Sequence, residues 1–537
     1  MPRKKHRVRP EPPPLVQLVP GVARLVGSLS LLRPLLAAMG IRRLVDDLVS
    51  MQRERQDGVS HGQVVEALVA NRLISPRPLS RIQEWAEGQG LGVAFGIEPQ
   101  ALNDSRIGRA LDALTDGWSA ADAGPPPLLE ELQTRVTLHF MRRFGIQPRE
   151  LGYDTTSLYF EGDYDESELV RFGYSRDHRP DLKQIVVGVG ATLDGGVAVH
   201  GRTYAGNRAD TTTTLETLER LKDLMPDTRR VLITTDRGMM TPPTVHALLG
   251  AQEPFIATLD ATKSHLDVLR AIPPEAFGPS VAREGYLVAE SAVEIVDQSD
   301  KTAPRAATVR AIAVWAPGKA ERDRKARERA LSRIQKRLGE IGEKLGQRRY
   351  RRLDYARERV EAVFSGELRQ YRPLYAIELI GGEEADSVTA MAVAMQMDAY
   401  RDRAALDGRY FIITSMPQDY GADQVLEAYK RRDVCEQAMR ILKTDLKVRP
   451  IFLHKDGRIA ALAYLTVFAL MVFTLLSALA KRLDLGTTAR HIFDLFWTVT
   501  FVRIRQFDGR WIDTYLNIDT AQVHVLRALG LPADLPP

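Results

Sequence analysis

Four side chains in residues 428–447 have types and spacings that could handle a phosphate group. Counted from the first of them, the four residues lie at offsets of 0, 3, 7 and 14: Tyr429, Arg432, Glu436 and Lys443. We consider the stretch as one helix. At roughly 100° per residue they fall within an arc of about 60° and form one narrow stripe. An acid flanked by two cations suits a group that holds a metal ion beside a phosphate. The same stripe also fits a surface helix with ion pairs at i,i+3 and i,i+4 spacing.

Two aspartates far upstream favour the phosphate interpretation. Asp154 lies inside a strand-like run, GYDTTSLYF, and Asp236 ends another, RRVLITTD. Ligands of an open sheet collect beyond the carboxyl ends of its strands, where these two side chains and Glu436 would meet. Three converging carboxylates require a compensating cation, and hard oxygen ligands select Mg²⁺ or Mn²⁺. Two such ions about 4 Å apart can activate an attacking oxygen and stabilise a leaving oxygen on phosphorus.

Three neighbours of the stripe have interpretations of their own. Arg431 and Arg440 are additional candidates for phosphate contacts, although a surface role fits them equally well. Cys435 is next to Glu436, but on a helix it points about 100° away from it, so we interpret it as buried filler.

Length and composition describe an ordinary globular protein with a basic balance. The 537 residues are 44% hydrophobic and 27% charged, which allows a large core divided over about three or four domains. The net charge of +5 is mild and indicates a polyanionic partner without proving one. The single cysteine excludes an internal disulfide and a Cys-cluster metal site, and it is compatible with a reducing cytoplasm. No apolar segment follows the basic N-terminus, so no secretory signal is predicted.

The elements that must position the carboxylates are predicted within residues 126–260. After a helix at 128–143, strand-like runs lie at 152–160, 183–193, 196–204, 229–236 and 254–259. Asp194-Gly195 is a hairpin turn signal between the second and third runs. Helical runs separate the later strands, so the order is β-β-β-α-β-α-β. This order predicts an α/β fold in which a mixed sheet carries helices on both faces.

A long segment, residues 261–420, interrupts the sheet pattern. Its own strand-like runs and its 160 residues identify it as an insertion subdomain rather than a loop. It also contains a strongly basic helical stretch, 318–360, which fits either a solvated helix face or a surface that follows phosphates. Residues 421–484 return to the core with the helix of Glu436, and 485–537 form a C-terminal segment without an assigned role.

The N-terminal region divides into a basic arm and a helical domain. Five of the first ten residues of the 1–14 arm are Lys or Arg. This composition fits an arm that touches nucleic-acid phosphates and, equally, a tail that is only solvated. Residues 15–125 have helical periodicity, a break near Gly40, a possible cap at Asn103 and no convincing strands. We interpret them as a DNA-binding domain of the helix-turn-helix kind, with a dimerisation or scaffold bundle as the alternative.

One apolar span, Ala460–Ala480, is long enough to cross a membrane. It has 21 residues and no charge. We favour a helix buried on all sides in a large core, because the span is solitary, carries Thr and Ser, and follows directly on a charged helix. No membrane association is therefore expected.

The motifs resemble those of the DDE transposases of bacterial insertion sequences. The resemblance rests on GYDTTSLYFEG, TTDRGM and the Tyr429-x2-Arg432-x3-Glu436-x6-Lys443 pattern, and it covers roughly residues 150–480. Within these transposases the pattern is similar to the Y-R-E-K signature of the superfamily named for insertion sequence four. The resemblance implies a ribonuclease H-like fold with a β-rich insertion before the helix that carries the glutamate.

The resemblance also implies roles for the site residues. Asp154, Asp236 and Glu436 would form a catalytic triad that binds two Mg²⁺ ions, for which Mn²⁺ can substitute. Tyr429, Arg432 and Lys443 would contact DNA phosphates near the cleaved end. Water would first free a 3′-hydroxyl at the end of the element, and that hydroxyl would then attack a target phosphodiester.

The implied partners are the terminal inverted repeats of the element and the target DNA, both double-stranded. A homodimer on DNA is expected, because two ends must be brought together, and the expected location is the bacterial cytoplasm at the nucleoid. Two other functions fit the same residues: a metal-dependent DNA nuclease that does not join strands, and a catalytically silent DNA-binding protein.

Overall fold

The computed structural model describes most of the chain as two compact units. The described residues are 23–49, 58–122, 124–208, 213, 215–217, 220, 232–235, 237–300, 302–382, 386–447, 451–506 and 509–532, with the backbone of 16–18. Unit 1 comprises Met1–Thr234 and Arg431–Pro537, and unit 2 comprises Thr235–Lys430.

Unit 1 contains the strands predicted to carry the first carboxylate. The strands β3 (Glu150–Tyr159), β4 (Gln184–Thr192), β5 (Ala198–Ala205) and β6 (Leu232–Thr235) lie in the order β5-β4-β3-β6. The first two pairings are antiparallel, whereas β3 and β6 are parallel, so the predicted mixed sheet is confirmed. The hairpin turn between β4 and β5 is also confirmed, since Gly195 and Gly196 have φ of +88° and +70°, values that glycine adopts without strain.

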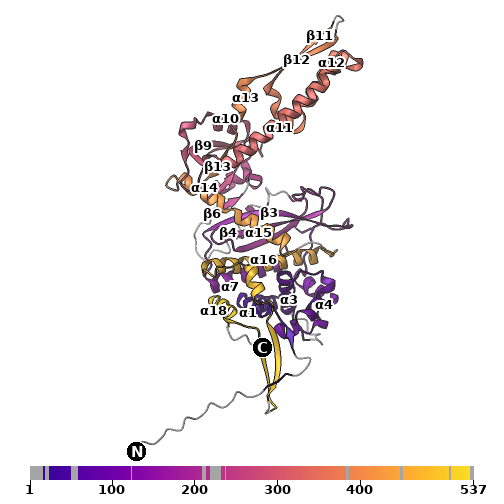
Figure 1. Cartoon of the computed structure of the whole chain (residues 1–537), viewed down its shortest axis with the longest axis vertical. Coiled ribbons are helices and arrows are strands. Elements are labelled where there is room, and N and C mark those ends of the chain that lie inside the picture. Colours follow the sequence, from indigo (N-terminus) through magenta and orange to yellow (C-terminus); the bar gives the residue numbers. More distant parts are fainter. Residues whose placement is uncertain are drawn as a thin grey trace, which may run out of the picture. The chain divides into compact units, whose positions relative to one another are not determined.

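The apolar helix α16 (Asp456–Arg482) is the central element of unit 1. Figure 1 shows it between the sheet and the N-terminal helices, and every residue from Ile459 to Leu476 is buried. By length and composition it is the one described helix that could cross a membrane, yet its apolar window is wholly buried in the protein. Thr474 accepts the backbone N–H of Ala198 on β5 at 3.0 Å. The predicted burial of this helix is confirmed.

The N-terminal part of unit 1 is helical, as its periodicity predicted. Its main helices are α1 (Leu29–Met39), α2 (Ile41–Leu48), α3 (His61–Ile74), α4 (Ile82–Gly88), α5 (Leu91–Phe95), α6 (Asp104–Ala113) and α7 (Pro127–Phe144). The break at Gly40, with φ of +72°, and the cap at Asn103 are both confirmed. Residues Gly62–Leu73 of α3 are all buried, so this helix offers no surface to a DNA groove. Arg458 of α16 holds α6 through Asp112, with contacts of 2.6 and 2.7 Å.

The expectation that residues 15–125 lack strands is wrong. Two short strands, β1 (Val16–Leu18) and β2 (Arg24–Leu25), pair with β14 (Thr500–Gln506) of the C-terminal segment. The segment continues with β15 (Trp511–Leu516), after α17 (Ala489–Leu495) and before α18 (Thr520–Ala528). The pairing partners are almost 500 residues apart in the chain, and β2 has only two residues, so neither strand has a local sequence signal.

Unit 2 has a sheet of five strands in the order β7-β13-β10-β9-β8. The strands are β7 (Phe255–Thr258), β8 (Gly278–Pro279), β9 (Leu287–Asp297), β10 (Arg305–Trp315) and β13 (Arg409–Thr414). Neighbouring strands of this sheet pair in antiparallel fashion. The helices α9 (Pro242–Gly250), α10 (Lys263–Ala271) and α14 (Ala422–Arg431) accompany them.

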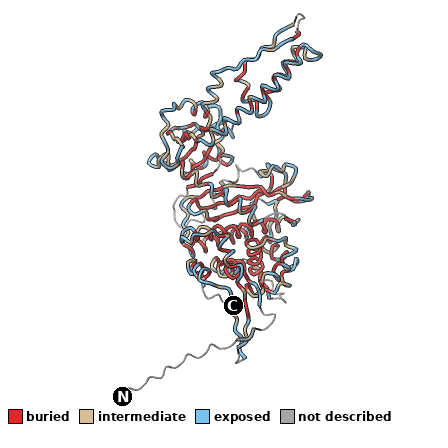
Figure 2. The backbone as a smooth tube through the Cα atoms, viewed as in Figure 1, coloured by how far each residue is buried: buried red, intermediate tan, exposed pale blue. Residues whose placement is uncertain are grey.

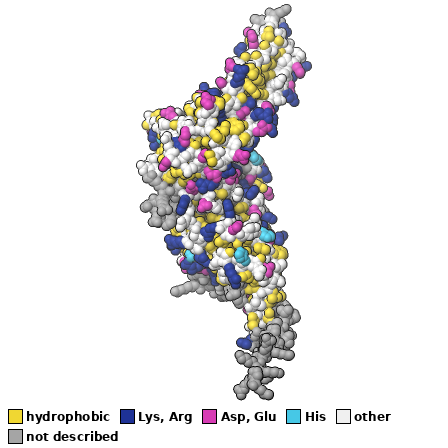
Figure 3. Space-filling view, turned by 60° about the vertical axis from the view of Figure 1, so that its left-hand side comes forward, with side chains coloured by type: hydrophobic (Ala, Val, Ile, Leu, Met, Phe, Trp, Pro, Cys, Tyr) yellow, Lys and Arg dark blue, Asp and Glu magenta, His cyan; other side chains and the backbone are white. Residues whose placement is uncertain are grey.

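The basic stretch of unit 2 is a helical hairpin rather than one helix. α11 (Pro317–Gly342) and α12 (Leu353–Val363) pack with the two-stranded ribbon of β11 (Tyr375–Gly381) and β12 (Val388–Met395), which α13 (Met397–Ala404) follows. A small core, with Ile334 and Val388 at its centre, joins them. Figure 2 shows that most of this hairpin remains exposed. In the face drawn in Figure 3, acidic and basic side chains are interspersed, which is typical of a solvated helix surface.

Candidate functional site

Asp154 lies in the middle of β3 on a defined face of the sheet. Its side chain is half-buried, and its Oδ1 accepts the backbone N–H of Thr155 at 2.8 Å. Because side chains alternate along a strand, Asp154 shares its face with Gly152 and not with Tyr153. The face that Gly152 occupies therefore decides what Asp154 can meet.

The helix α15 (Asp433–Thr444) packs directly on this face. A Cβ built on Gly152 would lie 2.5 Å from Sγ of Cys435, and one built on Gly196 would lie 3.3 Å from Cβ of Val434. Only glycine permits so close an approach of a helix to a strand. α15 thus brings Glu436, the residue after Cys435, to the side of the sheet on which Asp154 lies.

Glu436 is exposed, while its arginine neighbour is buried. The Glu436 side chain is 60% exposed, and its Oε1 accepts a hydrogen bond from Nη2 of Arg432 at 3.1 Å. The Arg432 side chain is only 8% exposed. The buried guanidinium orients the carboxylate beside it, and that carboxylate remains exposed to solvent, where a ligand can reach it.

The thiol of Cys435 reports the electrostatics of the site. Burial raises its pKa from 9.0 to about 12, the carboxylates of Asp154 and Glu436 add to the rise, and Arg432 opposes it. The packing of Cys435 against Gly152 sets Arg432 and Glu436 over the face of β3 that carries Asp154. The predicted burial of Cys435 is confirmed.

The predicted continuous helix over 428–447 is wrong. α14 ends at Arg431, Arg432 forms a turn with ψ of −18°, and α15 begins at Asp433. Glu436 and Lys443 are seven residues apart on α15 and share a face, but a single helical wheel cannot include Tyr429. The Tyr429 hydroxyl instead lies 3.2 Å from Oγ1 of Thr258 within unit 2.

The predicted phosphate-contacting cations differ in their surroundings. Lys443 lies 2.8 Å from Oδ1 of Asp177, and Arg431 lies 2.6 Å from Oε2 of Glu150 at the start of β3. Arg440 is exposed on α15. Two of these cations already have a carboxylate partner in the protein, and their contacts with DNA stay predictions.

Two residues near the site were not predicted: Arg176 and Asp177, in the connection between β3 and β4. The Arg176 guanidinium donates to Thr155, the residue after Asp154, and its backbone N–H donates to Oγ of Ser157 at 3.0 Å. Asp177 is the partner of Lys443 on α15. The run GYSRDHRPD mixes aromatic and charged residues, and that mixture was the available signal.

Asp236, the third predicted carboxylate, lies outside the described residues. Within the described ranges no group of three or more His, Cys, Asp or Glu side chains could hold a metal ion. Two members of the predicted set, Asp154 on β3 and Glu436 on the helix packed against it, supply hard oxygen donors, which suit Mg²⁺ or Mn²⁺. The donor chemistry of Asp154 and Glu436 fits the implied ions.

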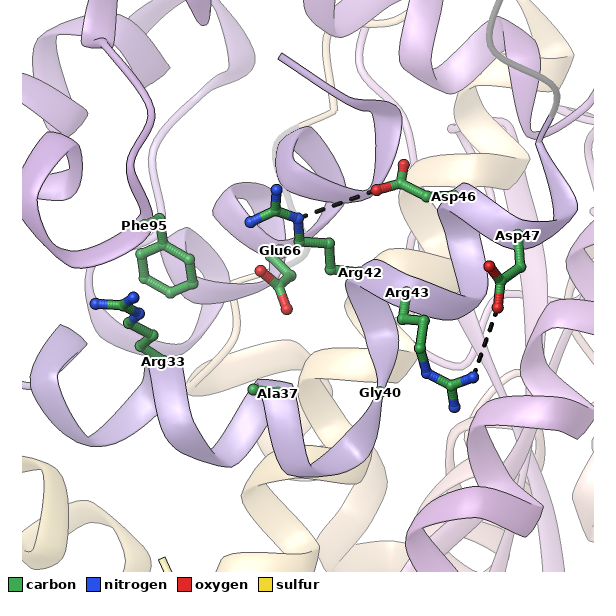
Figure 4. Close-up of a pocket in the computed structure, with 9 residues that line it drawn as sticks. All are labelled: Arg33, Ala37, Gly40, Arg42, Arg43, Asp46, Asp47, Glu66 and Phe95. Atoms are coloured by element: carbon green, nitrogen blue, oxygen red, sulfur yellow. Dashed lines mark ion pairs between the residues drawn. The ribbon is translucent and has the colours of Figure 1, made fainter. Parts of the chain in front are cut away.

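The helical part of unit 1 contains a separate pocket, shown in Figure 4. Its volume is 530 Å³, and helices α1, α2, α3 and α5 line it through Arg33, Ala37, Gly40, Arg42, Arg43, Asp46, Asp47, Glu66 and Phe95. Arg42 and Asp46 are 4.0 Å apart, and Asp46 also accepts from Ser60 and Gly62 at the start of α3. Burial raises the pKa of Glu66 from 4.5 to about 7, against the influence of Arg42. This carboxyl group therefore titrates near neutral pH.

Comparison with protein families identifies the class of the chain. The family described as "Transposase DDE domain" matches residues 154–472, which is more than half of the chain. The chain belongs to this family of DDE transposases, whose domains depend on divalent metal ions. A second family, described as "Domain of unknown function (DUF4277)", matches residues 22–120 in the helical part of unit 1.

Two further comparisons add little. No curated protein matches the chain. Among solved structures, the chain is similar to the piggyBac transposase in a synaptic complex with hairpin DNA, with 10% sequence identity, coverage of 90% of this chain and 82% of that chain, and a TM-score of 0.37. A similarity at this TM-score supports no argument about fold or function.

We expect Gly152→Ala to disturb the site through packing alone. The added methyl group meets Sγ of Cys435, and relieving that contact costs roughly 1–3 kcal/mol and moves α15 away from β3. The melting temperature should fall, and the double variant Gly152→Ala/Cys435→Ala should recover part of the loss. Gly88→Ala is the matched control, because open space surrounds Gly88. An unchanged melting temperature for Gly152→Ala would contradict the packing argument.

We expect Glu66→Gln to change the pH dependence of stability. The folded-state pKa of Glu66, about 7, exceeds its ordinary value of 4.5, so the stabilisation is complete below pH 4.5 and is lost as the pH rises through 7. Between these limits the free energy of unfolding of the wild type should fall by about 3 kcal/mol relative to the variant. Thermal unfolding of both proteins from pH 4.5 to 8 measures this. Buried His200, whose pKa is lowered to about 3, affects both proteins equally.

Proposed function

We propose that this DDE transposase belongs to the superfamily named for insertion sequence four and cleaves the ends of an element and joins them to target DNA. The carrying observation is the packing of α15, which carries Glu436 and follows buried Arg432, against the face of β3 on which Asp154 lies. The Y-R-E-K residues Tyr429, Arg432, Glu436 and Lys443 support the same assignment.

The register of β3 and β6 supports a place for the third carboxylate. In this parallel pair Gly152 is opposite Thr234. Asp154 follows Gly152 by two residues and Asp236 follows Thr234 by two residues. In our proposal Asp154, Asp236 and Glu436 together form the catalytic and metal-binding triad.

The proposed triad would hold two Mg²⁺ ions, with Mn²⁺ as a substitute. When bound, such ions neutralise charge on a phosphodiester and polarise its phosphorus–oxygen bonds. The protein's own contribution is orientation. The N–H of Thr155 orients the carboxylate of Asp154, and Arg432 orients that of Glu436.

The remaining cations fit a phosphate-binding role in this proposal. Lys443 and Arg440 share α15 with Glu436, whereas Tyr429 and Arg431 lie on α14. Lys443 would exchange Asp177, and Arg431 would exchange Glu150, for a phosphate when DNA binds. Each exchange replaces one charge-assisted contact with another.

The proposal extends to the wider organisation of the chain. The sheet of β3–β6 would be the ribonuclease H-like core, residues 261–420 its β-rich insertion, and residues 15–125 a DNA-binding domain. Two copies on DNA would hold the two terminal inverted repeats of an element in a bacterial cytoplasm. Buried α3 leaves the outer helices of residues 15–125 as the surface for DNA.

We expect Asp154→Asn and Glu436→Gln to abolish nicking of element-end DNA in Mg²⁺ while DNA binding persists. Losing a metal-bound carboxylate removes several kcal/mol of charge stabilisation, so the rate should fall roughly 1000-fold. Chelation of the metal should have the same effect, and added Mg²⁺ or Mn²⁺ should restore the wild type. Glu166→Gln, an exposed acid in the connection after β3, is the matched control. Wild-type nicking by either site variant would refute the proposed triad.

Joining is tested separately from cleavage. We expect the wild type, given precleaved ends with a free 3′-hydroxyl and a target plasmid, to produce joined DNA in Mg²⁺. Products are measured by gel analysis, with Asp154→Asn as the negative control. Nicking without any joined product would replace this proposal with the nuclease that does not join strands.

A further inference from the structure

Two aromatic side chains project into solvent from the connection between β3 and β4. Tyr174 is 84% exposed and Phe172 is 57% exposed. Two exposed rings only two residues apart form a candidate surface for a partner with flat apolar faces. The segment that carries them, residues 171–177, is called the aromatic segment below.

The backbone of the aromatic segment is fixed although its rings are exposed. Arg171 and Gln184 exchange two backbone hydrogen bonds of 3.0 and 2.8 Å, and the Gln184 side chain donates to the carbonyl of Tyr174 at 3.0 Å. Gly173 packs so closely that an added Cβ would lie 1.9 Å from the carbonyl oxygen of Gly206. The backbone that carries the rings is therefore held in place before any ligand arrives.

The aromatic segment is attached to both elements of the candidate site. Arg176 contacts the side chains of Thr155 and Ser157, which lie on the face of β3 opposite to Asp154. Asp177 contacts Lys443 of α15, the helix that carries Glu436. This second contact ties the segment to the side of the sheet on which the carboxylates lie.

Cations accompany the rings. The ammonium of Lys183 lies 5.8 Å from the centre of the Phe172 ring and also pairs with Asp165. The guanidinium of Arg179 lies 5.4 Å from the centre of another ring, Tyr159, and pairs with Asp181. Aromatic rings interleaved with Lys and Arg bind single strands of nucleic acid, because each base has a π-face and each linkage has a negative phosphate. Paired bases present no free face, so the rings select unpaired ones.

We propose that Phe172 and Tyr174 form a stacking platform for unpaired bases of the DNA strand that enters the Asp154–Glu436 site. The inference rests on the proposed function and adds to it a preference for DNA that is locally single-stranded. A docking site for another protein is the competing explanation for the exposed rings, and the experiment separates the two.

The test uses the full chain without divalent metal, so that only binding is measured. The probes are a blunt DNA duplex and the same duplex with a single-stranded extension of about six nucleotides that carries 2-aminopurine. Wild-type protein should bind the extended duplex more tightly and quench the 2-aminopurine fluorescence by stacking. Tyr174→Ala should weaken binding of the extended duplex by roughly five- to a hundredfold and reduce the quenching, with unchanged affinity for the blunt duplex.

Two further variants keep the result interpretable. Tyr174→Phe should retain both the affinity and the quenching, because it keeps the ring. Trp497→Ala, which removes a 58% exposed ring elsewhere in unit 1, should change neither. The proposal is overturned if the wild type shows no preference for the extended duplex, or if Tyr174→Ala binds both probes as the wild type does. Failure here with intact Asp154-dependent nicking leaves the transposase function standing, whereas loss of that nicking refutes the function itself.

Discussion

The direct contact of α15 with β3 at Gly152 and Cys435 is the constraint on which the candidate site depends. A helix can lie this close to a strand only where one residue lacks a side chain and the opposing residue is small. The buried thiol fills the junction, so the charged residues on either side of it, Arg432 and Glu436, are set against the strand of Asp154. The apolar contact thus fixes the positions of polar groups that would otherwise repel one another or stay apart in water.

Much of the fold could be predicted from periodicity because most elements have strong local signals. The alternating, β-branched run around Asp154 and the turn at Asp194-Gly195 gave β3, β4 and β5 nearly to the residue, and the uncharged span gave α16. β12 was missed because its sequence, VTAMAVAM, is rich in Ala and Met, which are weak strand formers. Pairing with β11 decides its conformation, and that pairing is not a local property.

The site was predicted in its residue types and only in part in its geometry. Asp154 and Glu436 were found because their types and contexts match a known chemistry. The turn at Arg432 was not, because its backbone remains near the helical region and no Gly or Pro marks it. The pairing of Asp177 with Lys443 joins residues 266 apart in the chain, and no spacing rule reaches that far.

The burial of α16 between the sheet and the N-terminal helices has a consequence during synthesis on the ribosome. The strands β3–β6 are complete when residue 235 has been made, but the helix that covers them ends at residue 482. At about 5–20 residues per second, the nascent sheet waits roughly 10 to 50 s with its inner face exposed. The hairpin of α11 and α12, which has its own small core, is finished earlier. The helix α16, which completes this core, is therefore made late. Until then the exposed face of the nascent sheet must be kept from aggregating.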